Sequence, residues 1–366
     1  MGTHRRGAGV GRRAVAGLLA AAAVTAACTD TGDPAPVPTP SPDESSEPAP
    51  SGVQVAVVLA TGGGPTLPTA DVEQRLAELA AERVGDIARI RPVVIDEADF
   101  VPDTAALLAD GGADLVCVIG GPAVRTVLDL ADRFPASRFC ALGAPRDDLP
   151  PNVDLLELDH EALGHVLGVA AAELAGDRPV GLILGGDSED RTRRRAGTRA
   201  ALAASPVVID AAVEDVGDAT DLVTGLDEEV EPAVVVVDTA STSVADVVAA
   251  IADAWIGPAD LTTDVPAAIA WSVRVDAIVA AAVDRLVTPD DPDLPTRLGF
   301  GEGVFTLAFG EGVADRVRDA TRIAADEFAR GARDPLRAVT RPRPTADDDD
   351  DQDDQDDQDD QDDVGP

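Results

Sequence analysis

The sequence predicts an α/β protein made of two doubly wound lobes, each with its own parallel sheet. Three observations predict this fold class. Between residues 53 and 340, short apolar segments alternate with longer segments of helical period. The short segments are β-branched and apolar throughout, which is typical of strands buried on both faces of a parallel sheet. They number about nine, more than a single doubly wound unit requires.

Helical segments separate most of the expected strands along the chain. The expected strands are 53–60, 90–95, 114–119, 138–142, 153–158, 179–184, 206–213, 233–238 and 266–270. The expected helices are 69–84, 103–110, 122–133, 160–175, 188–203, 218–228, 243–254, 273–287 and 312–331. Glycines follow several of the strands, at Gly62, Gly120, Gly143 and Gly185. A glycine there either lets the backbone approach a ligand or closes a tight turn, and both interpretations stay open.

The two ends of the chain lie outside this pattern. Residues 1–27 begin with arginines, continue into a short Ala/Val/Leu segment and end in small residues, which predicts an export signal. Residues 28–52 are rich in Pro, Ser, Thr and acid and predict an extended tether. Residues 341–366 contain an Asp/Gln repeat that cannot bury apolar surface, so we expect a disordered tail.

Cys28 stands directly after the export signal, behind Thr25, Ala26 and Ala27. This ending resembles the lipobox of bacterial lipoproteins, although Thr25 stands where that motif prefers Leu. The resemblance implies a lipid-modified Cys28 that anchors the chain on the extracytoplasmic face of the cell membrane. An ordinary signal peptide cleaved nearby is the alternative.

Composition excludes several classes of function. The formal net charge is −39 and every basic side chain outside histidine is Arg, so no nucleic-acid partner is expected. No nucleophile elbow, phosphate loop or dinucleotide fingerprint is present, so we expect neither an enzyme nor a cofactor. His160 and His165 are five residues apart, the wrong spacing for a shared helix face, so no metal site is expected.

Longer segments resemble the basic membrane protein (BMP) family, the substrate-binding lipoproteins of certain ABC transporters. Residues 112–143, GADLVCVIGGPAVRTVLDLADRFPASRFCALG, are similar to a strand, helix, Phe-Pro turn and short strand of that family. Residues 150–202 and 298–309 resemble further family segments in the same order. Phe134 and Phe139 are interpreted as core packing within this pattern.

The resemblance implies a type I periplasmic-binding fold, in which two lobes joined by a hinge close around a small solute. Residues 53–158 and about 273–290 would form the first lobe. Residues 160–270 and about 298–331 would form the second lobe. The implied protein is a monomer that delivers a small polar, nucleoside-like solute to an ABC permease. A lipoprotein that kept the fold but serves as a sensor or surface interaction module is the alternative.

The candidate ligand-binding positions are those that correspond to the family's cleft. They are Thr61, Gly62, Gly120, Gly143, Asp187, Thr239, Ser241, Asp260, Ser272 and Arg274. Most of the groups that bind a nucleoside in the family are absent, since Gly143 stands in place of an Asp. A stacking aromatic would have to come from Trp255 or Trp271, and we expect both in the core.

Two further clusters have competing interpretations. Arg191, Arg193, Arg194 and Arg195 either meet an anionic ligand or pair with acidic side chains, and we favour the pairing. Cys117 and Cys140 lie in neighbouring expected strands of an exported protein, and a disulfide between them is one interpretation. We expect buried free thiols instead, because in-register neighbours in a parallel sheet fit disulfide geometry poorly.

Overall fold

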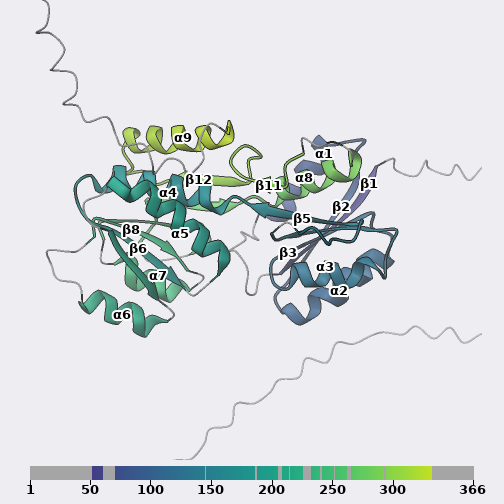
Figure 1. Cartoon of the computed structure of the whole chain (residues 1–366), viewed down its shortest axis with the longest axis horizontal. Coiled ribbons are helices and arrows are strands. Elements are labelled where there is room, and N and C mark those ends of the chain that lie inside the picture. Colours follow the sequence, from purple (N-terminus) through teal and green to yellow (C-terminus); the bar gives the residue numbers. More distant parts are fainter. Residues whose placement is uncertain are drawn as a thin grey trace, which may run out of the picture. The chain divides into compact units, whose positions relative to one another are not determined.

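A computed structural model describes residues 52–60 and 71–331, apart from residues 145, 186–187, 205–207, 214, 226–231, 240, 251, 262–264, 290 and 292–293. Two six-stranded sheets with helices on their faces form the framework, so the predicted α/β class with two mostly parallel sheets is confirmed (Figure 1). The export signal, Cys28, most of the tether and the acidic tail lie outside the described residues. Within the described ranges, no helix is both long enough and apolar enough to cross a membrane.

The first sheet has the strand order β11-β5-β4-β3-β1-β2, and all its pairs are parallel. Its strands are β1 (Val53–Ala60), β2 (Ile87–Ile95), β3 (Leu115–Ile119), β4 (Arg138–Leu142), β5 (Val153–Leu158) and β11 (Arg297–Leu298). The helices around this sheet are α1 (Val72–Glu82), α2 (Val101–Asp110), α3 (Ala123–Ala131) and α8 (Val275–Val287). Helices α2 and α3 cover one face, and α1 and α8 pack together over the other (Figure 1).

The second sheet has the order β12-β10-β9-β8-β6-β7 and is parallel except where β12 runs antiparallel to β10. Its strands are β6 (Val180–Gly185), β7 (Val208–Val213), β8 (Val234–Asp238), β9 (Ala254–Pro258), β10 (Ile269–Val273) and β12 (Phe305–Phe309). Its helices are α4 (His160–Ala175), α5 (Glu189–Ala201), α6 (Val216–Gly225), α7 (Thr242–Ala249) and α9 (Asp315–Ala329). Helices α6 and α7 share one apolar cluster with the sheet, while α4 and α9 share another.

The chain passes between the two sheets three times within the described ranges, from β5 to α4, from β10 to α8 and from β11 to β12. These connections are hydrogen-bonded to one another. The Asp159 N–H donates to the Leu298 carbonyl at 2.8 Å, and the Arg274 N–H donates to the Val304 carbonyl at 2.8 Å. The segments that link the sheets therefore run side by side.

Helix α4 is apolar on nearly every side because the second sheet, α5 and α9 all pack against it. Its contact with α5 is close enough to require glycine. A Cβ on Gly164 would lie 2.0 Å from the Arg194 carbonyl oxygen, and a Cβ on Gly197 would lie 2.1 Å from the Glu161 carbonyl oxygen. The two glycines let the helix backbones touch directly, which fixes α5 against α4.

Several sequence expectations differ from the structure around residue 254. The expected helix 243–254 ends at Ala249, and β9, which we did not expect, follows at Ala254–Pro258. The next strand begins at Ile269 rather than at residue 266. Strand β9 forms because Ala254 to Ile256 pair with Val234 to Val236 of β8, a long-range contact that overrides the local helical pattern.

The expectation of free thiols in the first sheet was wrong. Cys117 and Cys140 are paired across β3 and β4 and form a disulfide, with the two Cα atoms 4.5 Å apart. That separation is within the range that a disulfide spans, and both side chains lie on the same face because the residues are in register. The bond is fully buried and joins two adjacent strands just below the glycines at their ends.

Candidate functional site

The candidate positions cluster where strands end. In an open parallel sheet, ligands bind outside the carboxyl ends of the strands. Thr61, Gly62 and Asp187 lie outside the described residues. The other seven lie at or after the ends of strands. Gly120 follows β3, and Gly143 follows β4. Thr239 and Ser241 follow β8, Asp260 follows β9, and Ser272 and Arg274 lie at the end of β10.

Gly120 and Gly143 are glycines for reasons of space. Gly120 has a φ of +85°, and a Cβ there would lie 2.4 Å from the carbonyl oxygen of Ala60 at the end of β1. A Cβ at Gly143 would lie 2.6 Å from a methyl carbon of Val124. An acidic side chain at Gly143, as in the BMP pattern, would therefore require Val124 to move.

Thr239 and Ser241 shape the start of α7. The Thr239 hydroxyl oxygen accepts the Ser241 N–H at 3.1 Å, and the Ser241 hydroxyl oxygen accepts the Val244 N–H at 3.3 Å. These bonds form a turn and a helix cap, so both hydroxyls already have a structural role. Asp260 is exposed in the turn after β9.

Ser272 and Arg274 line a small pocket together with Val72 and Arg75 of α1. The Ser272 hydroxyl is 2.6 Å from the Thr306 hydroxyl of β12. The Arg274 guanidinium pairs with Asp276 in the first turn of α8, which raises the pKa of Arg274 further above its ordinary value. The pocket volume is about 20 Å³, room for roughly one water molecule or one oxygen of a ligand.

Both tryptophans are core residues, as expected. Trp255 is 1% exposed and donates its indole N–H to the Val265 carbonyl oxygen at 2.7 Å. Trp271 is 2% exposed, and the Arg194 guanidinium lies 5.2 Å from its ring centroid. Neither ring face is open to stack on a ligand.

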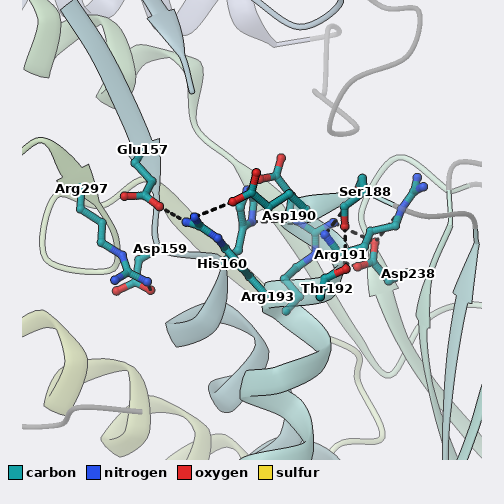
Figure 2. A network of polar contacts seen from close by, with 12 residues as sticks. Glu157, Asp159, His160, Ser188, Asp190, Arg191, Thr192, Arg193, Asp238 and Arg297 are labelled. Atoms are coloured by element: carbon teal, nitrogen blue, oxygen red, sulfur yellow. Dashed lines mark hydrogen bonds and ion pairs between the residues drawn. The ribbon is translucent and has the colours of Figure 1, made fainter. Parts of the chain in front are cut away.

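A buried ion network joins α4, α5 and β8; sequence reasoning considered His160 and Arg194 separately and did not connect them. Arg194 donates from Nε and Nη2 to the two carboxylate oxygens of Asp238, at 2.7 and 3.1 Å. It also donates from Nη1 to Nδ1 of His160 at 2.7 Å. His160 Nε2 faces the Asp190 carboxylate at 3.3 Å (Figure 2). The network therefore links Asp190, His160, Arg194 and Asp238 in one chain of contacts.

The protonation state of His160 follows from these contacts. An arginine can only donate, so Nδ1 of His160 is the acceptor and its proton is on Nε2, directed at Asp190. Burial lowers the pKa of His160 below its ordinary value, because desolvation disfavours the charged ring. The pKa of Asp190 is lowered as well, first by the hydrogen bond from His160 and also by Arg194 and Arg191.

Further ion pairs surround this network. Arg193 pairs with Glu157 of β5 and with Glu189, whose carboxylate is 2.7 Å away. Arg297 donates to Asp159 at 2.8 Å (Figure 2). The expected pairing of the arginine cluster with acidic side chains is thus found, with Arg194 buried rather than at the surface. One sequence signal could have identified Arg194 as the buried arginine. Gly197 and Thr198 follow it by three and four residues, so all three share the face of α5 that meets α4.

No known family model and no curated protein matches this chain. Solved structures do. An ABC transporter solute-binding protein from Conexibacter woesei is 20% identical with a TM-score of 0.59, over 77% of this chain and 98% of that one. A transcriptional activator of the comK gene from Bacillus halodurans is 18% identical with a TM-score of 0.58, over 77% and 99%. An ABC transporter solute-binding protein from Aeropyrum pernix is 17% identical with a TM-score of 0.54, over 76% and 92%.

The chain has the type I periplasmic-binding fold. The likeness rests on the arrangement of both sheets, since identities of this size carry no information about individual side chains. In this fold the strands of both sheets end toward the connections that link the lobes, where Arg274 and the His160 network lie. Among the described residues, no group of three or more His, Cys, Asp or Glu side chains is placed to hold a metal ion.

Proposed function

We propose that the chain is an extracytoplasmic solute-binding lipoprotein that delivers a small polar solute to an ABC permease. The observation that carries the proposal is the two-sheet framework whose lobes are linked by three hydrogen-bonded connections. Such connections permit hinge closure around a solute, and the closed form is what a permease would recognise. The proposal is a binding role rather than a catalytic one.

The proposed location rests on the N-terminal segment. Lipid attached to Cys28 would hold the chain on the membrane, and residues 29–52 would separate the folded part from the lipid. At about 3.1 Å per residue, an extended Pro-rich tether of this length spans roughly 70 Å. That reach would let the monomeric binding domain deliver its solute to a neighbouring permease.

The BMP resemblance suggests a nucleoside-like solute, and the structure bears on that suggestion. A nucleoside site needs an aromatic face for the base, but Trp255 and Trp271 are both buried. The carboxylate expected at Gly143 is replaced by a glycine that packs on Val124. A nucleoside is therefore one candidate solute among polar metabolites, and neither Trp255 nor Trp271 would stack on its base.

These same features favour a second candidate function, a sensor or interaction lipoprotein that retains the fold without transport. A fold does not dictate one function, and one of the similar structures is that of a transcriptional activator. The two candidates differ in what they predict about the genome. A permease and an ATPase encoded beside the gene would favour transport.

A thermal-shift screen of the full-length protein tests the binding role. Nucleosides, sugars, amino acids and organic acids would each be added at millimolar concentration. A solute that binds the folded state at 100 times its Kd stabilises it by about 2.7 kcal/mol, which raises Tm. A reproducible rise with one solute class supports the proposal, and no rise with any class would contradict solute binding.

A further inference from the structure

The pocket beside Arg274 contains two arginine side chains in an otherwise acidic chain. Its charged lining residues are Arg75, Arg274 and Asp276, two cations and one anion. The rest of the lining is Val72, Ser272, Val273 and Val275. Two guanidinium groups in one hollow of a chain whose net charge is −39 make that hollow a candidate site for an anionic group.

The two arginines have different surroundings. Arg274 is held by Asp276, to which its Nε donates at 3.3 Å, and this contact occupies one edge of the guanidinium. Asp276 is itself buried, with 8% of its side chain exposed, so it positions Arg274 rather than competing for solvent. Arg75 is exposed and forms no ion pair with any residue that the structure describes. Its charge is therefore available to a ligand.

Backbone groups add to the positive field. Helix α8 begins at Val275, within the lining, and no side chain caps its first turn. The first N–H groups of a helix have no partner within the helix and carry partial positive charge. Acidic side chains on α1 add negative charge near the pocket. Glu78 and Glu82 raise the pKa of Arg274, and the Glu78 carboxylate accepts a hydrogen bond from Gln74 at 2.8 Å.

The pocket itself has no room for a flat base. No aromatic side chain is among its lining residues, and its volume of about 20 Å³ is room for an oxygen atom rather than a ring. A carboxylate or phosphate oxygen fits both the size and the charge, because guanidinium groups bind such oxyanions with paired N–H donors.

We propose that this pocket binds the oxyanion group, a carboxylate or a phosphate, of the solute that the protein carries. The inference rests on the proposed solute-binding function and names the chemical class of its ligand. Arg75 supplies the free charge, Arg274 supplies a positioned guanidinium, and the start of α8 supplies N–H donors. The uncharged remainder of the solute would lie outside the pocket.

Binding measurements on the full-length protein test this proposal. The probes are succinate, L-glutamate and inorganic phosphate, with glucose and adenosine as uncharged probes, each titrated in low-salt and 150 mM salt buffer. We expect at least one oxyanion to bind, more weakly at the higher salt concentration. The affinities for the carboxylates and for phosphate are then compared, and the tighter class identifies which oxyanion the solute carries.

Three variants connect the binding to the pocket. Arg75→Gln removes an exposed charge and is expected to weaken oxyanion binding about tenfold or more, the value of one charge-assisted hydrogen bond. Arg274→Lys keeps the charge but loses the planar guanidinium with its paired N–H donors, so it is also expected to weaken oxyanion binding. The matched control is Arg125→Gln, on α3 of the same lobe, whose side chain is 87% exposed and whose partner Asp129 is 3.7 Å away. It is expected to leave affinity unchanged within twofold.

The outcomes separate this inference from the proposed function. If an oxyanion binds equally well to wild type and Arg75→Gln, the pocket is not its site and the inference is wrong. If only glucose or adenosine binds, solute binding stands and the oxyanion class is wrong. If none of the probes binds at any concentration, and the wider screen also finds no solute, the proposed function itself fails.

Discussion

Removing the Arg194 side chain is the most informative perturbation of the buried network. In Arg194→Met, Asp238 would lose both short hydrogen bonds, at 2.7 and 3.1 Å, and among the described residues its one remaining ion-pair partner would be Arg191 at 3.8 Å. The two partners are 7% and 10% exposed, so water cannot replace the lost bonds freely. Breaking a buried pair from one side destabilises a protein by about 3–5 kcal/mol, because it leaves an uncompensated charge.

The expected loss for Arg194→Met is therefore about 3–5 kcal/mol in the free energy of unfolding. Denaturant titration followed by circular dichroism measures it. The double variant Arg194→Met with Asp238→Leu removes both charges, so it should recover part of the lost stability. Arg125→Met is the surface control, for which the loss of the exposed pair with Asp129 should stay below about 1 kcal/mol. A loss below about 1 kcal/mol for Arg194→Met as well would refute the buried network.

Three further predictions follow from other contacts. Replacing both Cys117 and Cys140 by Ala should lower the free energy of unfolding by about 3 kcal/mol, because the disulfide joins residues that are 23 positions apart and so closes a loop. An unchanged free energy of unfolding under non-reducing conditions would contradict this. Because the folded-state pKa of His160 is lowered from 6.5, the unfolded chain binds its proton first, so stability should fall as pH drops below about 6.5, by up to about 1.4 kcal/mol per pH unit. His160→Asn, which keeps an acceptor for Arg194, should flatten the slope just below about pH 6.5, and an unchanged slope would assign it to other groups. Gly164→Ala should cost about 3 kcal/mol or more because its Cβ would meet backbone, whereas Gly312→Ala, with no atom within 4 Å of its Cβ, should be tolerated.

Much of the fold follows from local pattern. The segments VQVAVVLA and LVCVI are apolar at every position except Gln54, near the start of β1, because both faces of their sheet are covered by helices. Strand β9 could not be predicted in the same way. Its sequence, AWIGP, is short, ends in Gly257 and Pro258, and continues a helical pattern, so only its pairing with β8 makes it a strand.

The site was less predictable than the fold, because distant contacts decide it. Arg193, Arg194 and Arg195 are identical in type, yet only Arg194 is buried, since Gly197 lets α5 approach α4 at that face. The disulfide illustrates the same difficulty. Its formation depends on the exact register of β3 and β4, which places Cys117 beside Cys140.

The proposed role of Arg75 also depends on contacts that the sequence does not reveal. Nothing near it in the chain suggests a ligand, and α1 alone resembles an ordinary amphipathic helix. Only the packing of α1 against α8 brings it to the same pocket as Arg274. Ser272 and Arg274, by contrast, were named as candidates through the BMP resemblance, and both line this pocket.

The central claim, that a small solute binds where the strands end and the lobes connect, is tested most directly by hydrogen exchange. The full-length protein would be compared with and without the probe that raises its Tm most. The account predicts slower exchange at the start of α8, at residues 275–278, and at the start of α1, at residues 72–75, with little change in α6. Protection confined to other regions, or no protection at saturating probe, would contradict it.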